Sequence, residues 1–171
     1  MRPDGSLTDE DEVGEVVLRS ASLMRGYWQD AVATAAAVDA DGWYRTGDLG
    51  CVRGGRLFLD GRRRDRIIRG GENISPLEVE QRLLAHEGVE AVAVVGVPDD
   101  DLGQQALAVI VRRAGHALTA DDARAWVAQR LAHFKVPAHV VFVPELPYTA
   151  TGKLLKTELE RSAPDLLARA Q

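Results

Sequence analysis

Apolar residues in the second half of the chain fall in short continuous runs. Residues 89–98, VEAVAVVGVP, form a β-branched run typical of a strand buried on both faces. ALAVIVRR at 106–113 and HVVFV at 139–143 repeat this pattern. The acidic stretch DDD at 99–101 separates the first two runs. We therefore predict a small sheet of about three strands.

Helix signals lie between and after these runs. SPLE at 75–78 is a capping box with proline at the first helical position, and this helix is expected to end at Gly88. Thr119 is expected to cap a second helix, and LLKTELERS at 154–162 predicts a last amphipathic one. Ala123, Trp126, Val127 and Leu131 recur at helical spacing, and we expect them to face the core. Helices and strands in this order predict an α+β fold.

The first sixty residues have a different, β-rich pattern. VGEVVLRS at 13–20 has the composition of a strand. CVRGGRLFLDG at 51–61 predicts a hairpin, because paired glycines supply the positive φ angles of a tight primed turn. The change of pattern near residues 60–65 predicts a domain boundary there.

Composition and charge narrow the classes of function. The chain of 171 residues has 46% hydrophobic and 27% charged residues and a net charge of -5, which suits a soluble globular protein and disfavours nonspecific nucleic-acid binding. Five arginines between positions 62 and 69 leave a local basic patch open, although a solvated strand edge is the simpler interpretation. The single Cys51 excludes an intramolecular disulfide. An acidic start without an apolar core and the lack of a run of about 20 apolar residues favour a cytoplasmic protein without a membrane span.

Three short motifs each allow a structural and a functional interpretation. TATGKLL at 149–155 lacks the glycine and hydroxyl positions of a phosphate loop, so Lys153 is either a surface charge or a point charge held near a developing anion. Asp48, in the TGD at 46–48, is either a turn residue or an acceptor for ribose hydroxyls. Gly70-Gly71 is either a flexible corner or a place where a narrow ligand passes close to the backbone.

The order and spacing of six blocks identify a family resemblance. From about residue 13 to residue 160, the chain resembles the C-terminal part of adenylate-forming enzymes, most of all acyl- and aryl-CoA synthetases. The blocks are GEVVLRSASLMRGYW, DGWYRTGDLG, DGRRRDRIIRGGENISPLEVE, GVPDDDLGQ, FKVP and LPYTATGKLLKTEL.

The resemblance implies a two-step reaction, in a setting such as fatty acid metabolism. A carboxylate attacks the α-phosphate of Mg-ATP to give an acyl-adenylate, and a thiol, usually coenzyme A, then displaces AMP. Lys153 is the implied catalytic residue, which bridges the substrate carboxylate and the α-phosphate during adenylation. The implied nucleotide contacts are Asp48, on the ribose hydroxyls, and Arg62, on the ribose or phosphate. Gly70 and Gly71 are implied to lie beside the pantetheine arm during thioester formation.

The resemblance also accounts for the arginine run. Arg64 matches the family's hinge, where the small C-terminal domain rotates against the large one between the half-reactions. Relatives usually carry aspartate or lysine there, so Arg64 is a departure, and we expect it to be tolerated because a long charged side chain stays solvated in both states. Arg63, Arg66 and Arg69 are then solvated or interdomain charges, and nucleic acid is no longer the expected partner.

The resemblance implies that the site is divided between two domains. Residues 1–60 match the terminal β segment of the large AMP-binding domain, 61–65 the hinge, and 66–171 the AMP-binding enzyme C-terminal domain, a small lid. The pyrophosphate loop, the adenine-binding segment and the acyl pocket belong to the large domain, which also binds most of the Mg²⁺, and they are not in this sequence. We expect the chain to be inactive without that domain, supplied in cis or in trans. The alternative is a noncatalytic free-standing lid that docks on another ligase.

Overall fold

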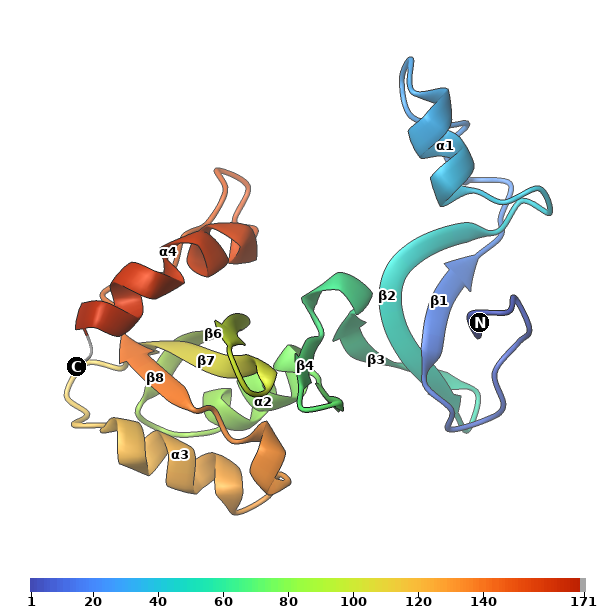
Figure 1. The fold of residues 1–171 in the computed structure, drawn as a ribbon. Helices are drawn as coiled ribbons and strands as arrows, with labels where there is room; N and C mark the ends of the chain where they lie inside the picture. The colour runs from blue at the N-terminus through green and yellow to red at the C-terminus, as the bar shows by residue number, and fades with distance from the viewer. Residues whose placement is uncertain (170–171) are drawn as a thin grey trace. The chain divides into compact units, whose positions relative to one another are not determined.

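The computed structural model describes residues 1–169, which divide into two compact units (Figure 1). The N-terminal unit is Met1–Arg64, and the C-terminal unit begins at Asp65. The N-terminal unit contains a three-stranded antiparallel sheet in the order β1-β2-β3. Its strands are β1 Gly14–Leu18, β2 Tyr44–Arg53 and β3 Arg56–Arg62, and helix α1 Ala31–Ala37 lies in the connection between β1 and β2.

The predicted glycine hairpin is confirmed as the turn between β2 and β3. Arg53 pairs with Arg56, and the two turn residues Gly54 and Gly55 have φ of +53° and +71°. Both angles lie in the left-handed region that a type I′ turn needs and that glycine adopts without steric cost. The alanine-rich helix α1 was not predicted; the Asp30 carboxylate caps it by accepting a 2.8 Å hydrogen bond from the Ala33 amide.

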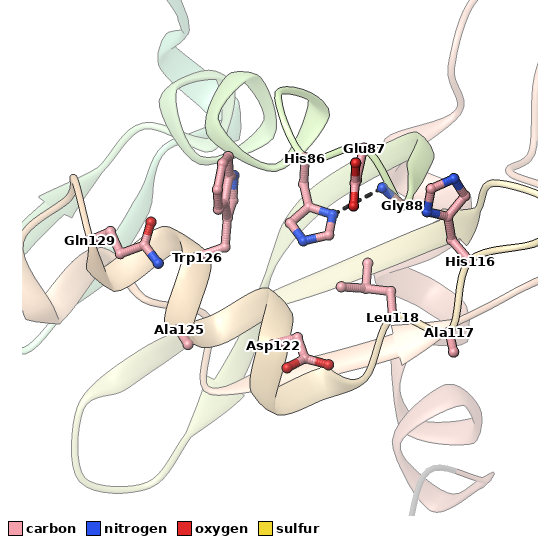
Figure 2. A pocket seen from close by; sticks show the side chains of 10 residues that line it. All are labelled: His86, Glu87, Gly88, His116, Ala117, Leu118, Asp122, Ala125, Trp126 and Gln129. Carbon is pink, nitrogen blue, oxygen red and sulfur yellow. Dashed lines mark hydrogen bonds between the residues drawn. The ribbon is translucent and has the colours of Figure 1, made fainter.

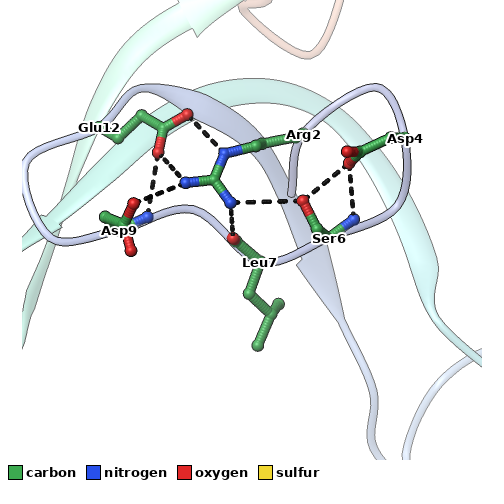
Figure 3. A network of polar contacts seen from close by, with 6 residues as sticks. All are labelled: Arg2, Asp4, Ser6, Leu7, Asp9 and Glu12. Atoms are coloured by element: carbon green, nitrogen blue, oxygen red, sulfur yellow. Dashed lines mark hydrogen bonds and ion pairs between the residues drawn. The ribbon is translucent and has the colours of Figure 1, made fainter.

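Arg2 is the centre of a network of polar contacts near the start of the chain, which includes the acidic residues Asp4, Asp9 and Glu12 (Figure 3). The Arg2 guanidinium donates to the carboxylates of Asp9 and Glu12 and to the Leu7 carbonyl oxygen. The hydrogen bond from Arg2 lowers the pKa of Glu12 below its ordinary value. A local ion network therefore holds together a segment that has few apolar residues.

The C-terminal unit contains a five-stranded mixed sheet. Its strands are β4 Ile67–Arg69, β5 Glu72–Ile74, β6 Val89–Asp99, β7 Gly103–Arg112 and β8 His139–Phe142. The order is β5-β4-β7-β6, and β8 pairs in parallel with β7. The three predicted strands are β6, β7 and β8, and the α+β class is confirmed. The short strands β4 and β5 enlarge the predicted sheet, because the glycine pair between them closes a second hairpin.

Helices cover both faces of this sheet. They are α2 Pro76–Leu84, α3 Ala120–Ala128 and α4 Lys156–Arg169, and one-turn 3₁₀ helices lie at Arg63–Asp65 (η1) and His133–Lys135 (η2). Alternate residues of β6 enter different cores: Val92 and Val94 pack with α2 and α3, whereas Ala93, Val95 and Val97 pack with α4. This period of two explains why the sequence shows an unbroken apolar run.

The boundaries of two predicted helices change in the structure. Helix α2 ends at Leu84 with Ala85 as its C-cap, so the expected end at Gly88 is wrong. A Cβ added at Gly88 would lie close to two histidine side chains, 3.3 Å from His86 Nδ1 and 3.4 Å from His116 Cβ. Helix α4 begins at Lys156 and continues past the predicted end at residue 162 to Arg169.

The predicted helix caps are present. The Ser75 hydroxyl accepts from the Glu78 amide at 3.4 Å, and Thr119 and Asp122 form a reciprocal capping box at the start of α3. Among residues 1–169, no helix is both long enough and apolar enough to cross a membrane.

Candidate functional site

Lys153 lies on a tight hydrogen-bonded turn between β8 and α4. Tyr148 and Leu154 form an antiparallel bridge at its base. The Thr149 amide donates to the Lys153 carbonyl oxygen at 2.8 Å, and the Lys153 amide donates to the Thr149 hydroxyl at 3.0 Å. Gly152, with φ of +81°, provides the left-handed residue that closes the turn. The backbone of Lys153 is therefore fixed by hydrogen bonds, although its side chain is exposed.

The three lysines of the chain differ in their partners. Lys135 Nζ lies 2.6 Å from the Glu78 carboxylate, and Lys156 Nζ lies 2.6 Å from the Glu80 carboxylate. Within residues 1–169, no carboxylate forms an ion pair with Lys153. The turn thus presents an ammonium group that the fold itself does not use.

Gly70 and Gly71 form the turn of the β4–β5 hairpin. Their φ angles are +56° and +86°, and Arg69 pairs with Glu72 across the turn. This is a defined primed turn rather than a flexible corner, because its conformation is set by the two strands it joins. A Cβ added at Gly71 would meet no atom within 4 Å, so that position faces open space.

The turn between β6 and β7 supports this glycine pair. The Gly70 amide donates to the Leu102 carbonyl oxygen at 2.8 Å. The Asp99 carboxylate accepts from the amides of Asp101 and Leu102, at 3.1 and 2.8 Å, and from the Gln105 side chain. The hydrogen bonds from Leu102 and then Gln105 lower the pKa of Asp99. In the sequence pattern, Asp99 marks only the separation of two apolar runs, although aspartate followed by Leu-Gly three residues later is a signal for such a turn.

Asp48 and Arg62 are cross-strand partners in the N-terminal unit. Arg62 Nε lies 3.1 Å from Asp48 Oδ1, and both side chains are partly exposed. Asp48 lies within β2, directly after Gly47, whose φ is +73°. The Thr46 hydroxyl accepts from the Asp48 amide at 3.0 Å and donates to the Val16 carbonyl oxygen at 2.7 Å, which fixes the TGD segment.

The predicted site residues are divided between the two units. Asp48 and Arg62 belong to the N-terminal unit, where Arg62 lines an open groove of about 500 Å³. Gly70, Gly71 and Lys153 belong to the C-terminal unit. Arg64 lies in η1 and is the last residue of the N-terminal unit.

A separate cavity of about 350 Å³ lies between the end of α2 and α3, and none of the predicted site residues lines it (Figure 2). Two of its polar side chains have structural partners: His86 Nδ1 accepts from the Gly88 amide at 3.0 Å, and Asp122 completes the α3 cap. The His86 ring lies edge-on to Trp126, with ring centroids 5.1 Å apart. Among residues 1–169, no group of three or more His, Cys, Asp or Glu side chains could hold a metal ion. We assign no ligand to this cavity.

Comparisons with known proteins agree with the resemblance seen in the sequence. Residues 78–153 match the family model of the AMP-binding enzyme C-terminal domain. The chain is 44% identical over 160 residues to a feruloyl-CoA synthase from an Amycolatopsis species, covering 93% of the chain and 32% of that enzyme. It is 43% identical over 162 residues to the 2-succinylbenzoate–CoA ligase of Geobacillus kaustophilus, covering 94% of the chain and 33% of that enzyme.

Solved structures give the same result. ATP-bound MatB from Rhodopseudomonas palustris matches with a TM-score of 0.90 and 32% identity, over 97% of this chain and 33% of that one. The o-succinylbenzoate CoA synthetase of Bacillus subtilis, solved with its acyl-adenylate intermediate, matches with a TM-score of 0.85 and 35% identity, over 92% of this chain and 32% of that one.

These findings define the class of the chain. Residues 78–153 belong to the AMP-binding enzyme C-terminal domain family, and nearly the whole chain is similar to the C-terminal portion of adenylate-forming enzymes, among them acyl- and aryl-CoA ligases. The chain spans about a third of the length of the curated relatives it matches.

Proposed function

We propose that the chain is the C-terminal part of a carboxylate–CoA ligase that forms an acyl-adenylate from ATP and then a thioester with CoA. It acts with a large AMP-binding domain in cis or in trans, in the cytoplasm. The observation that carries the proposal is Lys153, an exposed ammonium without an ion pair in residues 1–169, held on a fixed turn in a domain of this family.

Lys153 supplies positive charge to the adenylation step. When a carboxylate attacks the α-phosphate, negative charge builds on the phosphoryl oxygens before pyrophosphate leaves. A lysine acts there as a compact point charge, and such electrostatic stabilisation is often the largest single contribution to catalysis. Lys153 suits this role because it is not engaged by a carboxylate of the described chain.

The glycine turn serves the thioester step. Gly71 has no side chain and its Cβ position faces open space, so a narrow pantetheine arm passes beside the backbone without a clash. Gly70 is held by Leu102, which keeps the turn in place while the thiol approaches the acyl-adenylate.

Asp48 and Arg62 bind the nucleotide. The Asp48 carboxylate accepts from the two ribose hydroxyls, and Arg62, already 3.1 Å from Asp48 Oδ1, holds that carboxylate in position and contacts the ribose or phosphate. Arg64 is the hinge that brings Lys153 and then Gly71 to the reacting atoms. Mg²⁺ enters with ATP and is bound mainly by the large domain.

A chimera tests the proposal. The C-terminal third of the Amycolatopsis feruloyl-CoA synthase would be replaced by this chain, and ATP–pyrophosphate exchange dependent on the carboxylic acid would be measured. We expect exchange in the chimera and a fall of about 10²–10³-fold with Lys153→Ala. Arg161→Ala, which removes an exposed charge from α4, is the matched control and should leave exchange unchanged.

Two outcomes would contradict the proposal. Equal exchange by the Lys153→Ala chimera would refute the catalytic role of that residue. Stable docking of the free chain on a large domain, without exchange in either the mixture or the chimera, would instead favour the noncatalytic lid.

A further inference from the structure

The edge of β6 is closed by two charged side chains rather than by another strand. Val94 pairs with Ala108 of β7, and its own amide and carbonyl point away from that partner to hydrogen-bond elsewhere. The Val94 amide donates to Glu80 Oε1 at 2.8 Å, and Lys156 Nζ donates to the Val94 carbonyl oxygen at 3.3 Å. These contacts satisfy backbone groups that an edge strand would leave unpaired.

The same two side chains form an ion pair with each other. Lys156 Nζ lies 2.6 Å from Glu80 Oε1, and the two side chains are only 19% and 12% exposed. Glu80 belongs to α2 and Lys156 to α4, which pack on opposite faces of the sheet. We call Glu80, Val94 and Lys156 the edge clamp, because together they join both helices around the rim of the sheet.

Lys156 occupies a position that a helix disfavours for a cation. It is the first residue of α4, where the helix dipole is positive and repels an ammonium group. Its close contact with Glu80 and with the Val94 carbonyl offsets this repulsion. The edge clamp therefore ties the start of α4 to α2 and to the edge of β6.

Lys156 of the edge clamp lies three residues after Lys153 in the sequence. Between the two lysines, the Leu155 amide donates to the Pro147 carbonyl oxygen at 2.9 Å and closes the base of the turn. We propose that Lys156 and Glu80 are positioning residues for adenylation, an inference that rests on the proposed function. They fix the start of α4, and through it the turn that presents Lys153. Lys156 itself does not touch the substrate.

Hydrogen exchange in the full chain tests whether the edge clamp holds the turn, and this measurement does not require an active enzyme. We expect Lys156→Met to speed exchange of the Lys153, Leu155 and Val94 amides about tenfold, because the turn loses its anchor. Exchange in the centre of β7 should not change. Arg161→Met, an exposed charge on the same helix, is the control. If Lys156→Met does not fold, Glu80→Gln serves instead, since it keeps the shape of Glu80 and removes only the charge.

Unchanged hydrogen exchange of the Lys153 and Leu155 amides in the folded variants would overturn the proposal that the edge clamp holds the turn. So would uniformly faster exchange throughout the unit in both Lys156→Met and Glu80→Gln, which would mark a general structural role.

The ligase chimera supplies the second measurement. We expect Lys156→Met to slow acyl-adenylate formation about tenfold, to leave thioester formation from added acyl-adenylate unchanged, and to be rescued by Lys156→Arg. Equal loss in both half-reactions would overturn the positioning role. An inactive wild-type chimera would refute the proposed function alone. The hydrogen-exchange measurement on the full chain would still decide whether the edge clamp holds the turn.

Discussion

The two units differ in where their apolar side chains lie. Among residues 1–169, every apolar side chain of the buried core lies at or after Ile67, in the C-terminal unit. In the N-terminal unit, the consecutive residues Leu57, Phe58 and Leu59 of β3 are 52%, 47% and 56% exposed. Successive strand residues point to opposite faces, so both faces of β3 are open. The C-terminal unit therefore has a buried core of its own. The N-terminal sheet instead exposes apolar side chains, and we expect another protein surface to cover them.

A matched pair of leucine truncations gives the largest expected difference between the units. Leu107 in β7 is fully buried, so Leu107→Ala should lower the free energy of unfolding of the C-terminal unit by about 2–5 kcal/mol. Leu59 is 56% exposed, and Leu59→Ala should change stability by less than about 0.5 kcal/mol. Urea unfolding of both variants measures this difference. A large loss from Leu59→Ala in the isolated chain would mean that β3 is covered within the chain itself, and the contrast between the units would fail.

Hydrogen exchange sharpens the same comparison without mutation. Amides in β1, β2 and β3 should exchange at least about a hundredfold faster than those in the centre of β6 and β7, because local opening of the N-terminal sheet exposes little new apolar surface. The measurement is exchange followed residue by residue in the isolated chain. Covering the N-terminal sheet with a large AMP-binding domain should then slow its exchange and leave β6 and β7 unchanged. Equal protection in both units would contradict the idea that only one has a closed core.

The parts of the fold that the sequence predicted are those with a strong local pattern. The β-branched run at 89–98 became β6, and Thr119 with Asp122 became the cap of α3. Strands β4 and β5 have three residues each, too few to show a period, and they exist because the glycine turn pairs them and β7 accepts β4 beside it. The end of α2 was misplaced because the helix ends at Leu84 with Ala85 as its C-cap, and a glycine three residues further on does not by itself fix where a helix stops.

The candidate site follows the same rule. Lys153 and the glycine pair could be found from short motifs, because turns are encoded by neighbouring residues. The pairing of Asp48 with Arg62 depends on the register of β2 and β3, which contains an irregularity between Leu49 and Gly50. The contacts of Lys156 join segments up to 76 residues apart and could not be predicted from spacing.

Two glycine turns of the same type provide the next test, one in each unit. Gly55 and Gly71 both have positive φ, and at both positions a Cβ would meet no atom within 4 Å. Gly55→Leu and Gly71→Leu should therefore cost a similar amount, about 1–2 kcal/mol, from the left-handed backbone alone. In the ligase chimera, only Gly71→Leu should also slow thioester formation, and adenylation should be spared in both. Thermal unfolding and the two half-reactions measure these effects. If Gly71→Leu slows both half-reactions together, the pantetheine path does not run beside Gly71.

The smallest expected effect is an acid-sensitive turn in the otherwise well-packed C-terminal unit. Hydrogen bonds from Leu102 and Gln105 lower the pKa of Asp99 below its ordinary value of 3.8. The folded carboxyl thus has a lower pKa than the unfolded one, so its contribution to stability is fully present above about pH 4 and is lost as the pH falls through the folded pKa. Gly70 depends on this turn through the Leu102 carbonyl oxygen, so exchange of the Gly70 amide should accelerate, beyond its intrinsic pH dependence, only below that range. Asp99→Asn keeps an oxygen that can accept from the Leu102 amide but does not titrate, and it should abolish this acid-dependent change. The same acid response in Asp99→Asn would show that another group opens the turn, whereas no response in either protein would show that the Asp99 carboxylate does not hold it.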